Sequence, residues 1–179
     1  MLTFNDIIDS HSKVLINKIA VRDDRRKLTY SDVVSNGNNL ANYLKKLGVK
    51  KKDRIALLAF NCSEFIEIKY ASSKLSAIIA PINFRLSIQE IIDVIKDAKP
   101  ECLIFDCAFL SEYRKIRKLK LLNTKNFICI NKTKINVNCE DYHNIINTKS
   151  SATLFKTSIH SDWSLMYTSG TTGEPKGVV

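Results

Sequence analysis

The chain has 179 residues, 45% of them hydrophobic and 26% charged, which is typical of a globular protein and excludes a disordered one. Its formal net charge of +10 raises the question of an acidic partner such as nucleic acid or an anionic membrane surface. The five cysteines form no CxxC pair and no histidine stands at metal-ligand spacing, so neither a disulfide framework nor a zinc site is predicted.

The N-terminal part of the chain predicts two helices with an extended segment between them. Apolar residues at helical spacing favour a helix over residues 5–17, and residues 19–22 follow as extended chain. Thr29 and Asp32 have the spacing of a capping box, in which the hydroxyl and the carboxylate each accept a backbone amide. A helix is therefore expected over residues 30–47, where a glycine follows.

The middle of the chain alternates buried strands with helices. Three continuous apolar runs have the length of strands: residues 54–60, 77–82 and 101–106. Such runs are typical of parallel strands that are covered on both faces. One helix is expected to begin near residues 61–64, and Ser87 and Glu90 form the capping box of the next. Parallel neighbours need a crossover helix, so the sequence predicts an α/β fold with a parallel, helix-covered sheet.

Residues 114–120 predict a basic amphipathic helix, because apolar residues recur at helical spacing among five lysines and arginines. We interpret it as the solvated face of a helix that covers the sheet. No aromatic residue interleaves its charges as it would in a protein that stacks nucleic-acid bases. Further on, residues 127–130 predict a strand, residues 131–161 an irregular polar stretch, and residues 164–168 a strand that leads into the last motif.

The last 13 residues, YTSGTTGEPKGVV, hold three of the five glycines of the chain. Glycines let a backbone approach a ligand closely and turn successive amides toward one oxyanion. The threonine and serine hydroxyls add neutral donors, and Lys176 adds a point charge. Pro175 stands where a Walker A loop has glycine, and the residues after Lys176 favour a strand instead of a helix. The motif therefore predicts a polyphosphate cradle between two strands.

This motif resembles the signature loop of the AMP-forming acyl-CoA synthetases, a family of adenylate-forming enzymes. The likeness covers most of the chain, since KLTYSDV, NNLANYLKKLGVKKKDRIALLAFN and ASSKLSAIIAPINFRLSIQEI precede the loop in the expected order. Two departures are visible, because Lys52 and Ser76 stand where the family usually has glycine. Asn83, Phe84 and Arg85 favour the acyl-CoA branch over the peptide-synthetase adenylation domains.

The resemblance implies a two-step ligase. A carboxylate, either a fatty or an aryl acid, attacks the α-phosphate of Mg²⁺-bound ATP to give an acyl-adenylate, and the thiol of coenzyme A then displaces AMP. Preorganised donors and Mg²⁺ stabilise the charge on the phosphoryl oxygens. By the family's pattern, Thr168 is also a Mg²⁺ contact, and the β- and γ-phosphates are held by seven residues: Thr168, Ser169, Gly170, Thr171, Thr172, Gly173 and Lys176.

The family's remaining motifs lie downstream of the phosphate loop. The resemblance therefore implies that residues 1–179 are the N-terminal part of the AMP-binding domain, ending just after the loop at residues 168–177. No catalytic side chain is expected among them, and the chain alone is expected to be inactive. Two alternatives stay open: a non-catalytic nucleotide- or anion-binding module, and a basic nucleic-acid-binding domain, although no nucleic acid is expected as a partner. The oligomeric state is left open.

The remaining features indicate location and structure. The N-terminus has no basic leader and no apolar run is long enough to span a bilayer, so a cytoplasmic protein without a transmembrane segment is expected. His11, His143 and His160 stand apart from any nucleophile and are interpreted as surface or structural residues. Trp163 and Tyr167 are interpreted as packing residues that position the loop.

Overall fold

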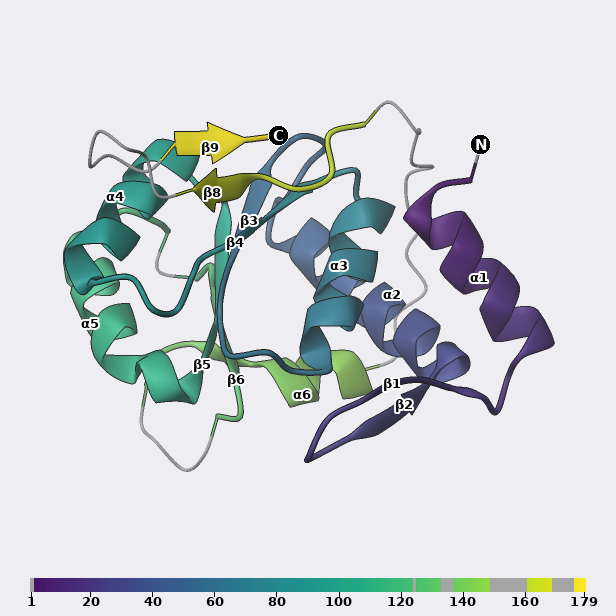
Figure 1. Ribbon diagram of the computed structural model, residues 1–179. Coiled ribbons are helices and arrows are strands. Elements are labelled where there is room, and N and C mark those ends of the chain that lie inside the picture. The colour runs from purple at the N-terminus through teal and green to yellow at the C-terminus, as the bar shows by residue number, and fades with distance from the viewer. Residues whose placement is uncertain (1, 124, 133–136, 149–160, 169–175) are drawn as a thin grey trace.

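The computed structural model describes residues 2–123, 125–132, 137–148, 161–168 and 176–179 (Figure 1). At its centre, five parallel strands form a sheet in the order β4-β3-β5-β6-β7. These strands are β3 (Arg54–Leu58), β4 (Ile78–Pro81), β5 (Cys102–Asp106), β6 (Phe127–Ile130) and β7 (Glu140–Asp141). The prediction of an α/β fold with a parallel sheet is confirmed.

Helices cover both faces of this sheet (Figure 1). One face carries α2 (Tyr30–Lys46), α3 (Glu64–Lys74) and α6 (Tyr142–Asn147), and the other carries α4 (Ile88–Ala98) and α5 (Leu110–Lys118). Alternate side chains of one strand enter different cores, because successive residues of a strand point to opposite faces. In β3, Ile55 and Leu57 pack with the first group of helices, whereas Ala56 and Leu58 pack with the second. Burial on both faces explains the continuous apolar runs.

Both predicted capping boxes are present. The amide of Asp32 donates to the Thr29 hydroxyl at 3.1 Å, and the amide of Thr29 donates to the Asp32 carboxylate at 2.8 Å. Ser87 and Glu90 make the same reciprocal pair at the start of α4. Helix α2 ends as predicted, with Gly48 following at a φ of 101°. Local sequence therefore sets where these helices begin and end.

The prediction of an irregular stretch over residues 131–161 is wrong for residues 140–147, which form β7 and α6. The aspartate before α6 caps it, since Asp141 accepts the amide of Asn144 at 3.0 Å. Ile145 and Ile146 then pack into the core beneath α2. An element of six residues is too short to show a helical period, so packing and not periodicity decides it.

The N-terminal part of the chain lies outside the sheet. Helix α1 (Phe4–Val14) is followed by an antiparallel hairpin of β1 (Ile19–Arg22) and β2 (Lys27–Thr29). Helix α1 contacts both α2 and α3, where the ammonium of Lys74 and the hydroxyl of Tyr70 bind Asp9. Among the helices in the described part of the chain, none combines the length and the apolar content that a membrane crossing requires.

Candidate functional site

The two ends of the predicted phosphate loop are held side by side. Strand β8 (Met166–Thr168) pairs antiparallel with β9 (Lys176–Val178), and Thr168 lies directly opposite Lys176 in this pair. The expectation of a strand on each side of the loop is confirmed, with Lys176 inside the second strand. The other predicted loop residues lie outside the described part of the chain: Ser169, Gly170, Thr171, Thr172 and Gly173.

Main-chain hydrogen bonds attach the chain that leads into β8 to the edge of the central sheet. The amide of Ile79 in β4 donates to the carbonyl of Trp163 at 3.0 Å, and the amide of Leu165 donates to the carbonyl of Ile79 at 2.8 Å. Ser164 thereby forms a parallel bridge with Ile79, and the β8–β9 pair lies beside this edge of the sheet (Figure 1). The sheet, and not the loop itself, therefore sets the position of the loop ends.

Two aromatic side chains add anchors to this segment. The hydroxyl of Tyr167 donates to the carboxylate of Asp97, at the end of α4, with a distance of 2.6 Å. Burial and this carboxylate both raise the pKa of Tyr167 above its usual value. The Trp163 ring packs on Phe4 with centroids 5.2 Å apart, and the ammonium of Lys69 lies 5.1 Å from its centre. These contacts agree with the interpretation of Trp163 and Tyr167 as packing residues.

Gly177, which follows Lys176, lies close to the side chains of Leu165 and Tyr167. A Cβ on Gly177 would lie 2.9 Å from Leu165 Cδ1 and 3.3 Å from two ring carbons of Tyr167. Leu165 Cδ1 is the end of a flexible side chain, so a larger residue at Gly177 requires a shift of this side chain.

The described part of the loop suits an anion. Thr168 and Lys176 are both exposed, and Lys176 has no carboxylate within ion-pair distance among the residues described. A hydroxyl opposite an unneutralised ammonium can contact phosphate oxygens, and a hydroxyl oxygen is a ligand type that Mg²⁺ accepts. No group of three or more histidine, cysteine or acidic side chains is arranged for a metal ion within the described ranges. A Mg²⁺ contact at Thr168 stays a prediction.

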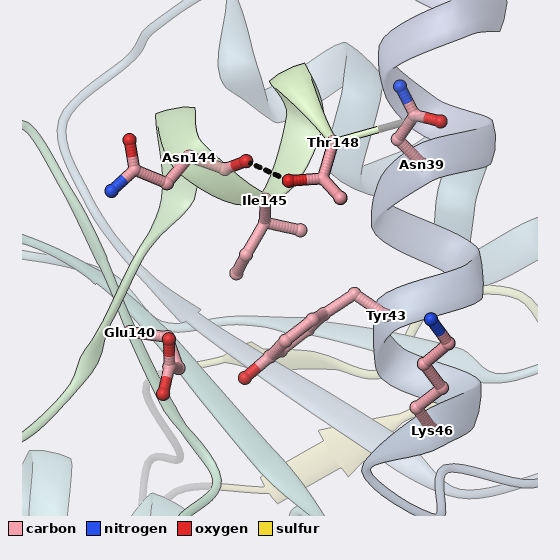
Figure 2. A pocket seen from close by; sticks show the side chains of 7 residues that line it. All are labelled: Asn39, Tyr43, Lys46, Glu140, Asn144, Ile145 and Thr148. Atoms are coloured by element: carbon pink, nitrogen blue, oxygen red, sulfur yellow. Dashed lines mark hydrogen bonds between the residues drawn. The ribbon is translucent and has the colours of Figure 1, made fainter. Parts of the chain in front are cut away.

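A cavity of about 220 Å³ lies between α2 and α6, and none of its lining residues belongs to β8 or β9 (Figure 2). The cavity is lined by Asn39, Tyr43, Lys46, Glu140, Asn144, Ile145 and Thr148. Burial and the nearby Glu140 raise the pKa of Tyr43 to about 12, so its hydroxyl stays protonated. Ligand pockets usually enclose about 300–1,000 Å³. This cavity is smaller than a nucleotide site, and we assign it no role in the chemistry.

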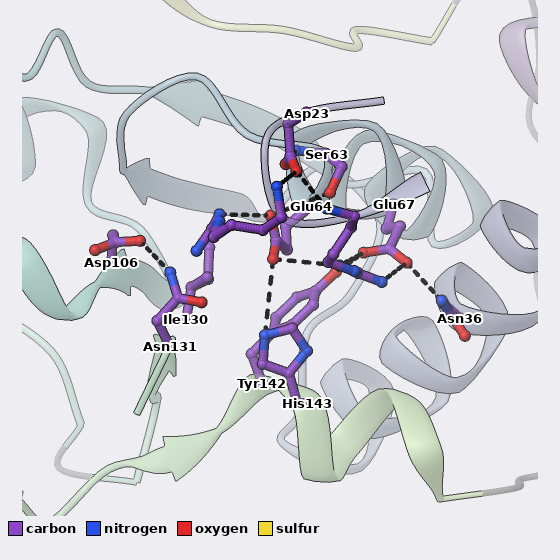
Figure 3. A network of polar contacts seen from close by, with 12 residues as sticks. Asp23, Asn36, Ser63, Glu64, Glu67, Asp106, Ile130, Asn131, Tyr142 and His143 are labelled. Atoms are coloured by element: carbon purple, nitrogen blue, oxygen red, sulfur yellow. Dashed lines mark hydrogen bonds and ion pairs between the residues drawn. The ribbon is translucent and has the colours of Figure 1, made fainter. Parts of the chain in front are cut away.

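A cluster of charged side chains lies near the carboxyl ends of β3, β5 and β6, where open α/β sheets often bind ligands (Figure 3). Glu64 and Glu67 of α3 are fully buried. Arg26, from the turn between β1 and β2, binds both carboxylate oxygens of Glu67 at 3.0 Å and reaches Glu64 at 3.2 Å. Arg25 lies 3.3 Å from Glu64, so two cations balance two anions.

Neutral groups complete this cluster. Asn36 of α2 donates to Glu67 at 2.6 Å, and the hydroxyl of Tyr142 in α6 donates to the same carboxylate at 2.9 Å. His143 lies 3.7 Å from Glu64, in agreement with its interpretation as a structural residue. The cluster therefore joins the hairpin turn, α2, α3 and α6, and its carboxylates and guanidinium groups bind one another. We interpret it as structural.

The cluster was missed by sequence reasoning for a physical reason. Arg26 and Glu67 are separated by 41 positions, and no local spacing connects a charged turn with a helix so far along the chain. A signal was nevertheless present, because Glu64 and Glu67 lie one turn apart in a helix that follows a fully buried strand. Buried carboxylates of this kind require cations nearby.

Comparisons with known proteins bear on the whole chain. A sequence profile described as "AMP-binding enzyme" matches residues 9–179. The chain is 33% identical over 158 residues to the crotonobetaine/carnitine–CoA ligase of Salmonella typhimurium, an alignment that covers 86% of this chain and 30% of that enzyme. The chain therefore spans less than a third of the length of this curated relative.

Solved structures agree with the sequence match. The anthranilate CoA ligase AuaEII, in complex with anthranoyl-AMP, superposes with a TM-score of 0.88 and 28% identity over 97% of this chain and 33% of its own. Acetoacetyl-CoA synthetase from Streptomyces lividans superposes with a TM-score of 0.85 over 99% of this chain and 30% of its own. At 17% identity, the second likeness shows the fold alone.

Proposed function

The chain belongs to the AMP-binding enzyme family, and on this premise we propose that it supplies the ATP phosphate loop of an adenylate-forming acyl-CoA ligase. The observation that carries the proposal is the antiparallel pairing of Thr168 with Lys176, which closes the glycine- and hydroxyl-rich segment between them. A loop closed at its base can present successive amides to one polyphosphate. Family membership supports ATP as the source of this polyphosphate.

Each group of the loop has a distinct role in this proposal. Lys176 places its ammonium beside the β- and γ-phosphates, and Ser169, Thr171 and Thr172 donate hydroxyl hydrogens to them. Gly170 and Gly173 allow the backbone amides to approach. The Thr168 hydroxyl would contact a bound Mg²⁺ ion, which would neutralise part of the phosphate charge. These groups stabilise the charge of the leaving pyrophosphate. Their contribution is electrostatic and involves no proton transfer.

We propose a carboxylic acid, fatty or aryl, as the substrate to be activated, with coenzyme A as the acceptor. The crotonobetaine/carnitine–CoA ligase and the anthranilate CoA ligase are both named as CoA ligases of carboxylic acids. The second was solved with anthranoyl-AMP, the type of intermediate that this reaction requires. The chain covers 33% of that ligase, so binding of the acid and of the thiol is proposed for an enzyme that contains this chain.

The experiment is carboxylate-dependent exchange of labelled pyrophosphate into ATP by a protein that contains this chain, with fatty and aryl acids as substrates. Lys176→Ala should lower the exchange rate by at least about tenfold, since one charged contact is worth roughly 1.5–3 kcal/mol. Lys118→Ala, an exposed lysine on α5, is the matched control and should leave the rate unchanged. Exchange that is unaffected by Lys176→Ala, or that needs no carboxylate, contradicts the proposal.

A further inference from the structure

The β8–β9 pair, which carries both ends of the phosphate loop, has few side-chain contacts of its own. All six of its residues are described, and only Tyr167 among them is half-buried, whereas the others are exposed. Tyr167 packs against the core cluster that α4 and α5 cover. The main-chain bonds to Ile79 come from Trp163 and Leu165, which precede β8. Within the pair itself, Tyr167 is therefore the side chain that attaches the loop ends to the body of the molecule.

The side chain of Tyr167 reaches from β9 to α4. In the β8–β9 ladder, Tyr167 lies opposite Gly177, and two of its ring carbons are 3.3 Å from the place of a Cβ on that glycine. Its hydroxyl donates to the carboxylate of Asp97 at 2.6 Å. Thr168 and Lys176 form the neighbouring pair of the same ladder. A displacement of the Tyr167 ring would therefore displace the two residues between which the loop runs.

Asp97 lies where a carboxylate does not help its own helix. It belongs to the last turn of α4 and is exposed. The carbonyl groups at the C-terminal end of a helix carry partial negative charge, which disfavours an acidic side chain there. Asp93, one turn earlier, binds Gln89 and Lys96 of the same helix, whereas Asp97 accepts a hydrogen bond from outside it. The carboxylate of Asp97 therefore stabilises a contact between α4 and β8 and not α4 itself.

Arg54, the first residue of β3, fixes the turn that carries Asp97. Its Nε donates to the carbonyl of Ala98 at 2.7 Å, and its guanidinium also donates to the carbonyl of Lys99 at 3.3 Å. The end of α4 is thus held to the central sheet. Burial, followed by the hydrogen bond and charge of Asp97, raises the pKa of Tyr167, although Arg54 opposes this rise. The Tyr167 hydroxyl consequently keeps the proton that it donates.

We propose that Asp97 is a positioning residue for the phosphate loop: by accepting the hydrogen bond of Tyr167, it holds Thr168 and Lys176 in the place from which the loop binds polyphosphate. This inference rests on the proposed function, because it concerns the same site. Asp97 contacts no substrate in this role and acts only through Tyr167. Its loss should therefore weaken polyphosphate binding without removing any group that binds phosphate, since a binding site depends on the residues that orient it.

The test measures the Kd of the 179-residue chain for magnesium pyrophosphate by two-dimensional NMR titration. Asp97→Ala and Tyr167→Phe each remove the hydrogen bond and should raise the Kd at least about threefold. Asp97→Asn keeps an oxygen that can accept the hydrogen bond, so it should restore the Kd to within about twofold of the unchanged chain. Asp93→Ala, an acidic residue of the same helix, is the matched control and should leave the Kd unchanged.

A double variant separates positioning from a general loss of stability. Asp97→Ala combined with Tyr167→Phe should bind pyrophosphate no more weakly than either single variant, because both substitutions remove the same bond. The Kd describes folded molecules, so a smaller folded fraction does not imitate the effect. Hydrogen exchange of the β8 and β9 amides should also be faster in Asp97→Ala than in Asp93→Ala, because the pair loses its side-chain attachment.

Three results would overturn this inference and leave the proposed function standing. The first is an unchanged Kd in Asp97→Ala while Lys176→Ala binds weakly. The second is a double variant in which the two losses add, and the third is an Asp97→Asn chain that binds as weakly as Asp97→Ala. An unchanged chain that binds no pyrophosphate would overturn both the inference and the proposed function.

Discussion

The amide of Lys52 donates to the carbonyl of Ser76 at 2.9 Å, and both residues have left-handed backbones, with φ of 70° and 52°. They are the two positions at which the sequence departs from glycine in the pattern that it resembles. A left-handed conformation costs a residue with a Cβ about 1–2 kcal/mol, whereas glycine adopts it freely. The departures from the pattern therefore mark two strained turns that meet each other.

Lys52→Gly should consequently stabilise the chain. Relief of the strain exceeds the added entropy of the unfolded chain, so the free energy of unfolding should rise by about 0.5–1 kcal/mol. Urea unfolding followed by circular dichroism measures the change. Lys51→Gly is the matched control, because this neighbouring turn residue has no positive φ and should lose stability. Equal effects of the two substitutions would show that strain at Lys52 is negligible.

The local elements of the fold could be predicted because their causes are local. Thr29 with Asp32, and Ser87 with Glu90, contain within four residues all the groups that cap a helix. Apolar runs identified β3, β4 and β5 because burial on both faces leaves few polar positions in them. Helix α6 was not predicted because it has only six residues and forms where they pack against α2.

Gly37→Ala should destabilise the chain because α2 and α3 approach each other closely at this position. An added Cβ would overlap the ring of Tyr70 and lie 3.3 Å from the carbonyl oxygen of Glu67. Overpacking of this kind costs about 1–3 kcal/mol, which exceeds the gain of about 1 kcal/mol in helix propensity. Ser35→Ala, on the exposed side of the same helix, is the control and should be neutral or slightly stabilising. If both substitutions stabilise the chain equally, the helices have room to separate.

Arg26→Ala should strongly lower the free energy of unfolding. The substitution removes the cation that Glu64 and Glu67 share, and both of these carboxylates are fully buried. Removing one partner of a buried ion pair costs about 3–5 kcal/mol. Arg22→Ala, at an exposed position on β1, is the control. Thermal unfolding of both variants checks this difference, and a loss no larger for Arg26→Ala than for Arg22→Ala would show that the cluster is not structural.

Because of Asp23, the free energy of unfolding should fall as the solution becomes acidic. Burial opposes its ionisation, but hydrogen bonds from the amides of Ser63, Arg25 and Arg26 outweigh burial and lower its pKa well below the ordinary value of 3.8. The Asp23 carboxyl group therefore stays ionised to a lower pH in the folded chain than in the unfolded chain. Its stabilising contribution is complete above the ordinary value and is lost as the pH falls toward the folded-state pKa.

The comparison that isolates this contribution is between the unchanged chain and Asp23→Asn, unfolded in urea at several values from about pH 5 to about pH 3. The unchanged chain should lose more stability over this window than the variant does. Parallel curves for the two proteins would mean that Asp23 has the same pKa in the folded and the unfolded chain.

For the candidate site, as for the fold, the sequence predicts the features with local causes and not those that depend on distant contacts. Its residue types are contiguous in sequence, so the strands on both sides of the motif could be predicted from the motif alone, while the polyphosphate cradle stays a prediction. Its placement could not, because the anchors are distant: Tyr167 binds Asp97, 70 positions away, and the chain before β8 pairs with Ile79. The interpretation of the basic helix as a solvated face also omitted a contact, since Arg117 donates to Tyr113 at 2.9 Å.

The central claim, that the segment closed by Thr168 and Lys176 binds polyphosphate, is tested most directly by a two-dimensional NMR titration of the 179-residue chain with magnesium pyrophosphate. Shifts should centre on residues 168–177 and weaken strongly in Lys176→Ala, while Lys118→Ala behaves like the unchanged chain. Because the loop ends are exposed, salt should weaken the binding. Shifts centred instead on α5, or on the cavity between α2 and α6, and unchanged by Lys176→Ala would contradict the claim.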